Sequence, residues 1–117
     1  MNGTAVVQQN LGFRKCKPHQ KGDLPLTMAF IKGYLVELSG WRLSRKGIVR
    51  TFEFKNFHET IEFVNALAYI AHRENHHPDL EVGYKTCKVC YCSHEVGGIS
   101  ENDFICATKV DELVTRA

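Results

Sequence analysis

Histidine is the residue type whose positions in this chain point to chemistry. Four of the six histidines lie between positions 72 and 94. His76 and His77 stand just before Pro78, where a helix is expected to end, and His94 stands at the end of a predicted strand. A helix end and a strand end can meet in a two-layer fold, so these three imidazoles are expected to line one pocket. Because imidazole titrates near neutral pH, such a pocket could donate and accept protons at physiological pH.

The same residues have structural explanations that spacing alone leaves open. A histidine near a helix C-terminus is stabilised by the helix dipole, and His-Pro is common where helices end. Asp103 stands three residues after Ser100, which is the spacing of a capping box at a helix N-terminus. On spacing alone, capping is favoured over a chemical role for Asp103.

A zinc site is the main alternative by residue type. His72 and His76 are four apart on a predicted helix, and Cys90, Cys92 and His94 share one face of a predicted strand. However, His72 is followed by arginine, not by the glutamate that zinc hydrolases use as a base, and the cysteines do not form the paired C-x-x-C of a structural site. We therefore expect no metal. A nucleophilic pairing of Cys92 with His94 also fits their positions, but no further signature supports it.

Apolar periodicity predicts the elements that position these groups. Three amphipathic helices are expected, over about 28–38, from Phe57 to shortly before His77, and from Ser100 onward. Strand patterns fall over 41–44, 48–54 and 80–94, the last bent near Gly83. Helical spacing places Phe30 and Phe57 on the inner faces of their helices. The order of elements suggests an antiparallel sheet covered on one side by helices, whose other, apolar face would favour self-association.

Length and composition exclude several classes of protein. The 117 residues suit one domain, and 44% hydrophobic with 24% charged residues is typical of globular proteins. A net charge of +2 is too small to indicate nucleic-acid binding, and no apolar run approaches the ~20 residues of a membrane helix. Five cysteines, an odd number, suit reduced thiols, and the first ten residues lack the features of a secretion signal. We expect a cytoplasmic protein with a flexible N-terminal arm over 1–23 and a domain over 24–117.

Several motifs occur together at intervals typical of one enzyme family. They are Asn75-His76-His77-Pro78-Asp79, Ser93-His94, Gly97-Gly98-Ile99-Ser100 and Asp103, with Gly40-Trp41, Phe52, Phe54, Phe57 and Phe63 upstream. In this combination the chain resembles the pterin-4a-carbinolamine dehydratase family over about residues 24–115. A single His-His-Pro would be weak evidence, whereas the combination at this spacing is specific.

The resemblance implies a fold, a reaction and a set of site residues. The fold would be α+β, a four-stranded antiparallel sheet with three helices packed on one face. The reaction would convert 4a-hydroxytetrahydropterin (4a-hydroxytetrahydrobiopterin) to quinonoid dihydropterin and water, which recycles the cofactor of aromatic amino acid hydroxylases. The implied catalytic residues are His76, His77 and His94, and the implied substrate contacts are His76, His77, Pro78, Ser93, His94, Glu95 and Val96. Asp103 is a candidate supporting residue.

The resemblance also implies partners and leaves alternatives open. No cofactor is expected, because the pterin is the substrate, and family members form homodimers and homotetramers. Functional coupling to an aromatic amino acid hydroxylase is expected, without nucleic-acid or membrane contact. This chain has His72 where the family often has an acidic residue. Some animal members serve as dimerisation partners of a transcription factor, so a non-catalytic regulatory role is one alternative, and zinc binding is the other.

Overall fold

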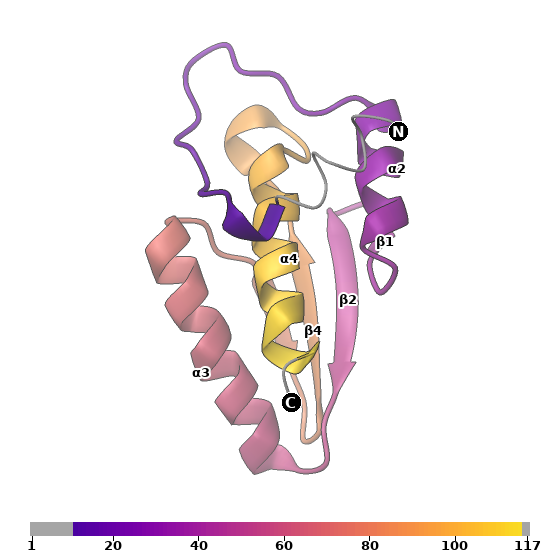
Figure 1. Ribbon diagram of the computed structural model, residues 1–117, viewed down its shortest axis with the longest axis vertical. Helices are drawn as coiled ribbons and strands as arrows, with labels where there is room; N and C mark the ends of the chain where they lie inside the picture. Colours follow the sequence, from indigo (N-terminus) through magenta and orange to yellow (C-terminus); the bar gives the residue numbers. More distant parts are fainter. Residues whose placement is uncertain (1–10, 116–117) are drawn as a thin grey trace.

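Four strands and three α-helices make up the part of the chain that the structure, a computed structural model, describes, residues 11–115 (Figure 1). The strands are β1 (Arg42–Leu43), β2 (Ile48–Glu53), β3 (Asp79–Val82) and β4 (Thr86–Tyr91). The α-helices are α2 (Met28–Glu37), α3 (Phe57–Glu74) and α4 (Glu101–Thr115), and the short 3-10 helices are η1 (Leu11–Phe13) and η2 (His94–Val96). The expected helices and the first hairpin are all present, with ends that differ by a few residues.

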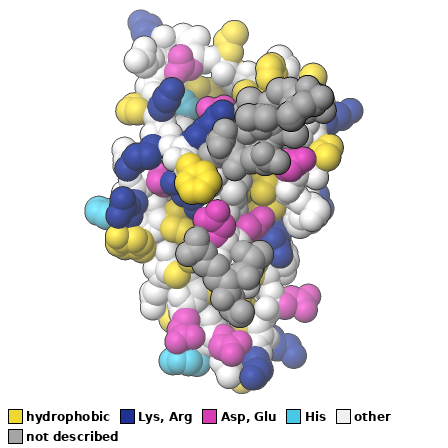
Figure 2. Space-filling view, in the orientation of Figure 1, with side chains coloured by type: hydrophobic (Ala, Val, Ile, Leu, Met, Phe, Trp, Pro, Cys, Tyr) yellow, Lys and Arg dark blue, Asp and Glu magenta, His cyan; other side chains and the backbone are white. Residues whose placement is uncertain are grey.

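The surface is mixed in charge. On the face shown in Figure 2, Lys and Arg side chains are interspersed with Asp and Glu side chains. This pattern agrees with the formal net charge of +2. Within residues 11–115, no helix combines the length and the apolar character needed to cross a membrane.

The sheet is antiparallel throughout, with the strand order β1-β2-β4-β3. Along the central strand β4, Cys87, Val89 and Tyr91 are fully buried, while the side chains between them are only half-buried. Successive side chains of a strand point to opposite faces, which is why burial alternates. The alternation expected from the sequence is therefore confirmed. The strand-like region over 80–94 is in fact a hairpin, because a turn at Gly83 separates β3 from β4.

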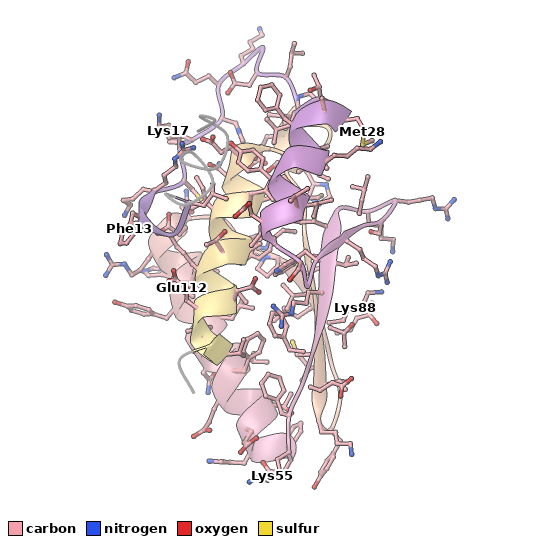
Figure 3. All side chains as sticks on the ribbon, turned by 45° about the vertical axis from the view of Figure 1, so that its right-hand side comes forward. Phe13, Lys17, Met28, Lys55, Lys88 and Glu112 are labelled. Carbon is pink, nitrogen blue, oxygen red and sulfur yellow. The ribbon has the colours of Figure 1, made fainter. Side chains whose placement is uncertain are left out.

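All three α-helices lie on one face of this sheet, as the turned view in Figure 3 shows. Helix α2 contributes Ile31 and Tyr34 to the core, together with Leu38 just after the helix, and helix α4 contributes its fully buried Phe104 and Val110. The α+β fold with a four-stranded antiparallel sheet and three helices on one face is confirmed.

Two aromatic residues lie outside the positions expected for them. Phe30 is 62% exposed and Phe57 is 48% exposed, whereas both were expected to face inward. Helix α3 packs instead through Thr60, Phe63 and Leu67. The apolar stripe of a helix is broad, so a residue at its edge can fall on either side of the packing interface, depending on how the helix is rotated.

The helix-free face of the sheet is polar, contrary to the apolar face expected from the sequence. The strand register places Thr51, Lys88 and Glu81 side by side on this face, and Lys88 Nζ lies 3.8 Å from Glu81 Oε2. In Figure 3 the labelled Lys88 lies on the side of the sheet away from the helices. The alternation in β2 sends one set of side chains to the core and a mostly polar set to this face.

Part of the segment expected to be a flexible arm is packed against the fold. Leu11 is buried, and the backbone N–H of Cys16 donates to Glu74 Oε1 at 2.8 Å. Lys17 is held through both backbone groups, because its N–H donates to Asn102 Oδ1 and its carbonyl accepts from Asn102 Nδ2. The flexible-arm prediction is therefore wrong for residues 11–17. Isolated anchors of this kind leave no periodic pattern in a sequence, and residues 1–10 lie outside the described part.

Candidate active site

The C-terminal end of helix α3 fixes where His76 stands. Asn75 adopts a left-handed conformation with φ of 52°, and the N–H of His76 donates to the carbonyl of Ala71 at 3.1 Å. This backbone arrangement is a Schellman-type helix end, which turns the chain away from the helix axis. His76 thus lies beyond the helix, and the four-residue spacing from His72 does not place the two imidazoles on one helix face.

His76 pairs with a buried carboxylate. His76 Nε2 and Asp103 Oδ1 are 2.6 Å apart, and the Asp103 side chain is fully buried while that of His76 is 10% exposed. The imidazole also stacks on Tyr91, with 5.7 Å between ring centroids and 17° between the ring planes. The end of α3, the start of α4 and the end of β4 therefore meet at this one ring.

The second carboxylate oxygen of Asp103 is held from the other side. Asp103 Oδ2 accepts from Ser93 Oγ and from the backbone N–H of Ser100, each at 2.9 Å. The two serine hydroxyls are themselves 2.7 Å apart. The bond from Ser100 N–H is the N-terminal capping contact expected from the sequence. Asp103 therefore caps helix α4 and orients His76 at the same time.

The charge on Asp103 sets the protonation of His76. Burial of the ring by itself would lower the pKa of His76, but the hydrogen bond and the negative charge of Asp103 outweigh it and raise the pKa above its ordinary value. The expectation that His76 would favour the imidazolium is thus supported by a specific carboxylate and not only by the helix dipole.

His94 lies in η2 and not at the end of a strand, because β4 stops at Tyr91. The chain leaves the sheet here through a bridge between Ser93 and Gly98. His94 is exposed, and its two ring nitrogens lie 3.7 and 3.8 Å from Cys92 Sγ. The strand assignment for His94 was wrong because the alternation of side chains continues past the point where the backbone pairing ends.

A pocket of 640 Å³ opens beside His94. Its walls come from the β1–β2 turn, the first residue of β3 and the chain around η2, and its lining residues are Ser44, Arg45, Lys46, Gly47, Asp79, Cys92, His94, Gly97, Gly98 and Ile99. Gly47 has φ of 154°, and a Cβ there would clash with the carbonyl oxygen of Tyr91. No role for Arg45, Lys46 or Asp79 was predicted from the sequence. Asp79 directly follows the His-His-Pro run, which was the signal that could have identified it.

Glu95 directly follows His94 in η2 and is exposed. The pKa of its carboxyl is lowered, first by a hydrogen bond from its own backbone N–H and further by the charges of His19, His76 and His94. His94 lines the 640 Å³ pocket, whereas His76 and His77 are not among the residues that line it.

The remaining predicted residues differ in how they are placed. His77 is exposed, and its Nδ1 approaches the carbonyl oxygen of Pro78 at 3.5 Å. Val96 is buried, and the hydroxyl of Ser93 is committed to Asp103 and Ser100. Ser93 is therefore placed to position Asp103. Among residues 11–115 no group of three or more histidine, cysteine, aspartate or glutamate side chains is arranged to hold a metal ion.

Comparisons with known proteins identify similar chains. A profile of the family described as pterin 4 alpha carbinolamine dehydratase matches residues 24–113. A protein of Nitrosomonas europaea is 54% identical over 101 residues, covering 86% of this chain and 89% of its own length. A protein of Bdellovibrio bacteriovorus is 55% identical over 95 residues, covering 78% of this chain and 79% of its own. Both are provisionally named pterin-4-alpha-carbinolamine dehydratase.

A solved structure is also similar. It is the crystal structure of a transcriptional coactivator/pterin dehydratase from Brucella melitensis, which superposes with a TM-score of 0.73 at 28% sequence identity. The match covers 76% of this chain and 97% of that one.

Proposed function

Because the chain belongs to the pterin 4 alpha carbinolamine dehydratase family, we propose that it converts 4a-hydroxytetrahydropterin to quinonoid dihydropterin and water. The reaction needs a proton on the departing C4a hydroxyl and the removal of one proton from a ring nitrogen. General acid and base groups near neutral pKa can supply both steps, and no redox or metal chemistry is required. The product suits recycling of the cofactor of aromatic amino acid hydroxylases.

The observation that carries this proposal is the buried pair of His76 and Asp103. Asp103 raises the pKa of His76 and occupies its Nε2, so the imidazolium keeps Nδ1–H to give to the substrate. Its position between α4, β4 and the end of α3 fixes the direction of that N–H. A charged, oriented imidazolium is suited to protonate a leaving hydroxyl.

His94 supplies the complementary group in this proposal. It lies on the wall of the 640 Å³ pocket, next in the chain to the exposed Glu95. His94 accepts the ring-nitrogen proton, while the exposed His77 contacts the bound pterin together with Pro78. Glu95 and Val96 follow His94 on the same short helix and complete the proposed substrate contacts.

The test is an assay of the purified full chain with synthetic 4a-hydroxytetrahydropterin. The quinonoid product should form faster than in buffer alone, and dialysis against a chelator should leave the rate unchanged. An uncatalysed rate in the presence of the protein would refute the proposal. Loss of activity after chelation, restored by zinc, would refute its metal-free mechanism.

A regulatory role is the second candidate. The observation in its favour is the likeness to the Brucella protein, which is described as a transcriptional coactivator as well as a pterin dehydratase. A purely regulatory protein would have no use for the hydrogen bond between His76 and Asp103. Dehydratase activity that is lost on replacing His76 would therefore favour catalysis, whereas an inactive protein with a fully folded site would favour regulation.

A further inference from the structure

Two thiols from distant parts of the chain meet on the side of helix α4 that the N-terminal segment covers. Cys16 Sγ and Cys106 Sγ are 3.5 Å apart, and both cysteines are free. Sulfur atoms in a disulfide are about 2.05 Å apart, so a shift of roughly 1.5 Å would bring these two into bonding distance. Within residues 11–115 no other two cysteine sulfurs lie in such contact.

The segment that carries Cys16 is held in place independently of the thiols. The N–H of Cys16 donates to Glu74, whose other carboxylate oxygen accepts from Lys109 Nζ at 2.8 Å. Asn102 holds the backbone of the next residue, Lys17, through two hydrogen bonds. The sulfurs therefore approach each other because the backbone is anchored on both sides, and not through a chance orientation of two side chains.

The two thiols differ in exposure. Cys106 is fully buried, whereas Cys16 is half-buried and can be reached from solvent. Their pKa values are also shifted in opposite directions. The pKa of Cys106 is lowered by the hydrogen bond from Cys16 and by the nearby charge of His76. The pKa of Cys16 is raised by its hydrogen bond to Cys106, by burial and by the Glu74 carboxylate. The pair combines an accessible thiol with a buried sulfur that favours the thiolate, which is the nucleophilic form.

We propose that Cys16 and Cys106 form a redox-active dithiol site that reacts with low-molecular-weight disulfides. In the first step, Cys16 passes its proton to the Cys106 thiolate across their hydrogen bond, and the Cys16 thiolate so formed attacks one sulfur of the small disulfide. The departing small thiolate takes that proton back from Cys106, which becomes a thiolate again. In the second step, the Cys106 thiolate attacks Cys16 Sγ and displaces the other small thiolate, which takes up a proton from solvent. Two protein thiols are thereby oxidised to one disulfide, and one small disulfide is reduced to two thiols.

The site is separate from the proposed pterin chemistry, although it lies next to it. Cys106 Sγ approaches the backbone carbonyl of His76 at 4.0 Å, so the new bond would tie the N-terminal segment to α4 directly behind that residue. The reaction uses no histidine side chain, and it can be measured without any pterin.

The experiment exposes the reduced full chain to a series of glutathione redox buffers, followed by acid quenching, alkylation and mass spectrometry. The oxidised chain should be lighter by two hydrogens, and digestion should give one linked peptide that joins Cys16 to Cys106. The other three cysteines should remain alkylated. Thiols that stay reduced throughout the series would overturn the proposal.

Variants separate the two steps. Cys106→Ala removes the second thiol, so a glutathione adduct should accumulate on Cys16. Cys87→Ala is the matched control, because Cys87 is also fully buried but has no thiol partner within residues 11–115, and this variant should form the linked peptide as the unmodified chain does. If Cys106→Ala does not fold, Cys16→Ser at the accessible position should prevent both the linkage and any adduct on Cys106. A stable adduct on Cys16 in the unmodified chain, without the linked peptide, would also overturn the proposal.

Discussion

Asp103 uses each of its two carboxylate oxygens for a different purpose. Oδ2 accepts from Ser100 N–H and Ser93 Oγ, which fixes the start of helix α4. Oδ1 contacts His76, which comes from a different part of the chain. The sequence predicted the first role from a three-residue spacing. That spacing could not predict the contact with His76, because a satisfied capping role leaves no sign that the other oxygen has a long-range partner; only the family resemblance marked Asp103 as a candidate supporting residue.

Replacing this carboxylate should change the pH dependence of the reaction. As the proton donor, His76 is active while protonated, so the rate should fall as pH rises through its raised pKa. In Asp103→Asn the neutral amide no longer stabilises the imidazolium, so the pKa of His76 should fall and the alkaline limb of kcat should move to lower pH. The pH profile of kcat and an NMR titration of His76 measure both effects.

Stability gives a second readout for the same substitution. A raised histidine pKa stabilises the folded state fully below the unfolded value of about 6.5, and this contribution is lost as pH rises through the folded pKa. The difference in unfolding free energy between the unmodified chain and Asp103→Asn should thus shrink with increasing pH. Asp111→Asn is the matched control, since that half-buried carboxylate of α4 accepts hydrogen bonds from Trp41 and Arg50. An alkaline limb that stays in place while the NMR pKa falls would exclude His76 as the acid.

The three histidines should contribute unequally to catalysis. His76→Ala and His94→Ala should each lower kcat by roughly 10²- to 10⁴-fold, the usual effect of losing an acid or base group. His77→Ala should act mainly through KM, because it removes binding shared by ground and transition states. Steady-state kinetics of the three variants measure this division.

Two further variants complete that comparison. The double variant at His76 and His94 should lose little beyond the worse single variant if the two groups act as a unit. His58→Ala is the control, because His58 is exposed in the first turn of α3 and pairs with Glu62. A His77→Ala variant that loses the most kcat, beside a His76→Ala variant near full turnover, would show that the assignment is wrong.

Helix α3 shows which features of a single helix can be predicted from the sequence. Its length and its end before Pro78 follow from apolar periodicity and from the restriction that proline imposes on the preceding residue. The sequence did not reveal that the helix stops at Glu74, that Asn75 turns left-handed, or that Phe57 stays at the surface beside Tyr84. These details depend on how the helix docks on the sheet, which local sequence does not encode.

The two asparagines that bound α3 should separate stability from catalysis. Asn56 caps the N-terminus by accepting from Glu59 N–H at 2.9 Å, and Asn56→Ala should cost about 1 kcal/mol of unfolding free energy without changing kcat. Asn75→Ala should cost about 1–2 kcal/mol, because alanine disfavours the left-handed conformation, and it should also lower kcat by displacing His76. Asn75→Gly should restore stability and activity, because glycine adopts this conformation freely. Denaturant unfolding and the dehydratase assay together test this, and equal kcat for both alanine variants would contradict it.

At the scale of the whole molecule, the sequence predicted the arrangement of a sheet covered by helices better than it predicted which residues lie at the molecular surface. The buried alternation of Cys87, Val89 and Tyr91 and the apolar face of α4 were sufficient to define a sheet covered by helices. The surfaces depended on contacts between distant residues. Two such features are the packing of residues 11–17 and the polar, helix-free face of the sheet. Both depend on how distant segments of the chain pair in the folded protein. His76 and His94 were predicted as site residues because the residue type itself suggests acid–base chemistry, whereas the pocket residues Arg45 and Lys46 carry no such signal.

We still expect the chain to self-associate, but through the exposed apolar side chains near α2 and not through the helix-free face of the sheet. The helix-free face is polar, but α2 and the chain before it expose large apolar side chains, with Leu24 85%, Phe30 62% and Val36 76% exposed. Apolar residues gathered on one short helix are typical of surfaces that become buried between subunits. We therefore expect a homodimer or homotetramer in which α2 packs against another copy of the chain.

Light scattering at micromolar concentration measures this directly and should give at least twice the mass of one chain. The double variant Phe30→Asp/Val36→Asp should shift the mass toward that of a monomer, because each carboxylate would have to be buried unpaired in the interface. Tyr69→Asp is the matched control, since Tyr69 is equally exposed on α3 but lies away from α2. Phe30 and Val36 are both exposed on the single chain, so circular dichroism of the double variant should show an intact fold. A monomeric mass for the unmodified chain would contradict the expectation, and an unchanged oligomer in the double variant would show that α2 is not the interface.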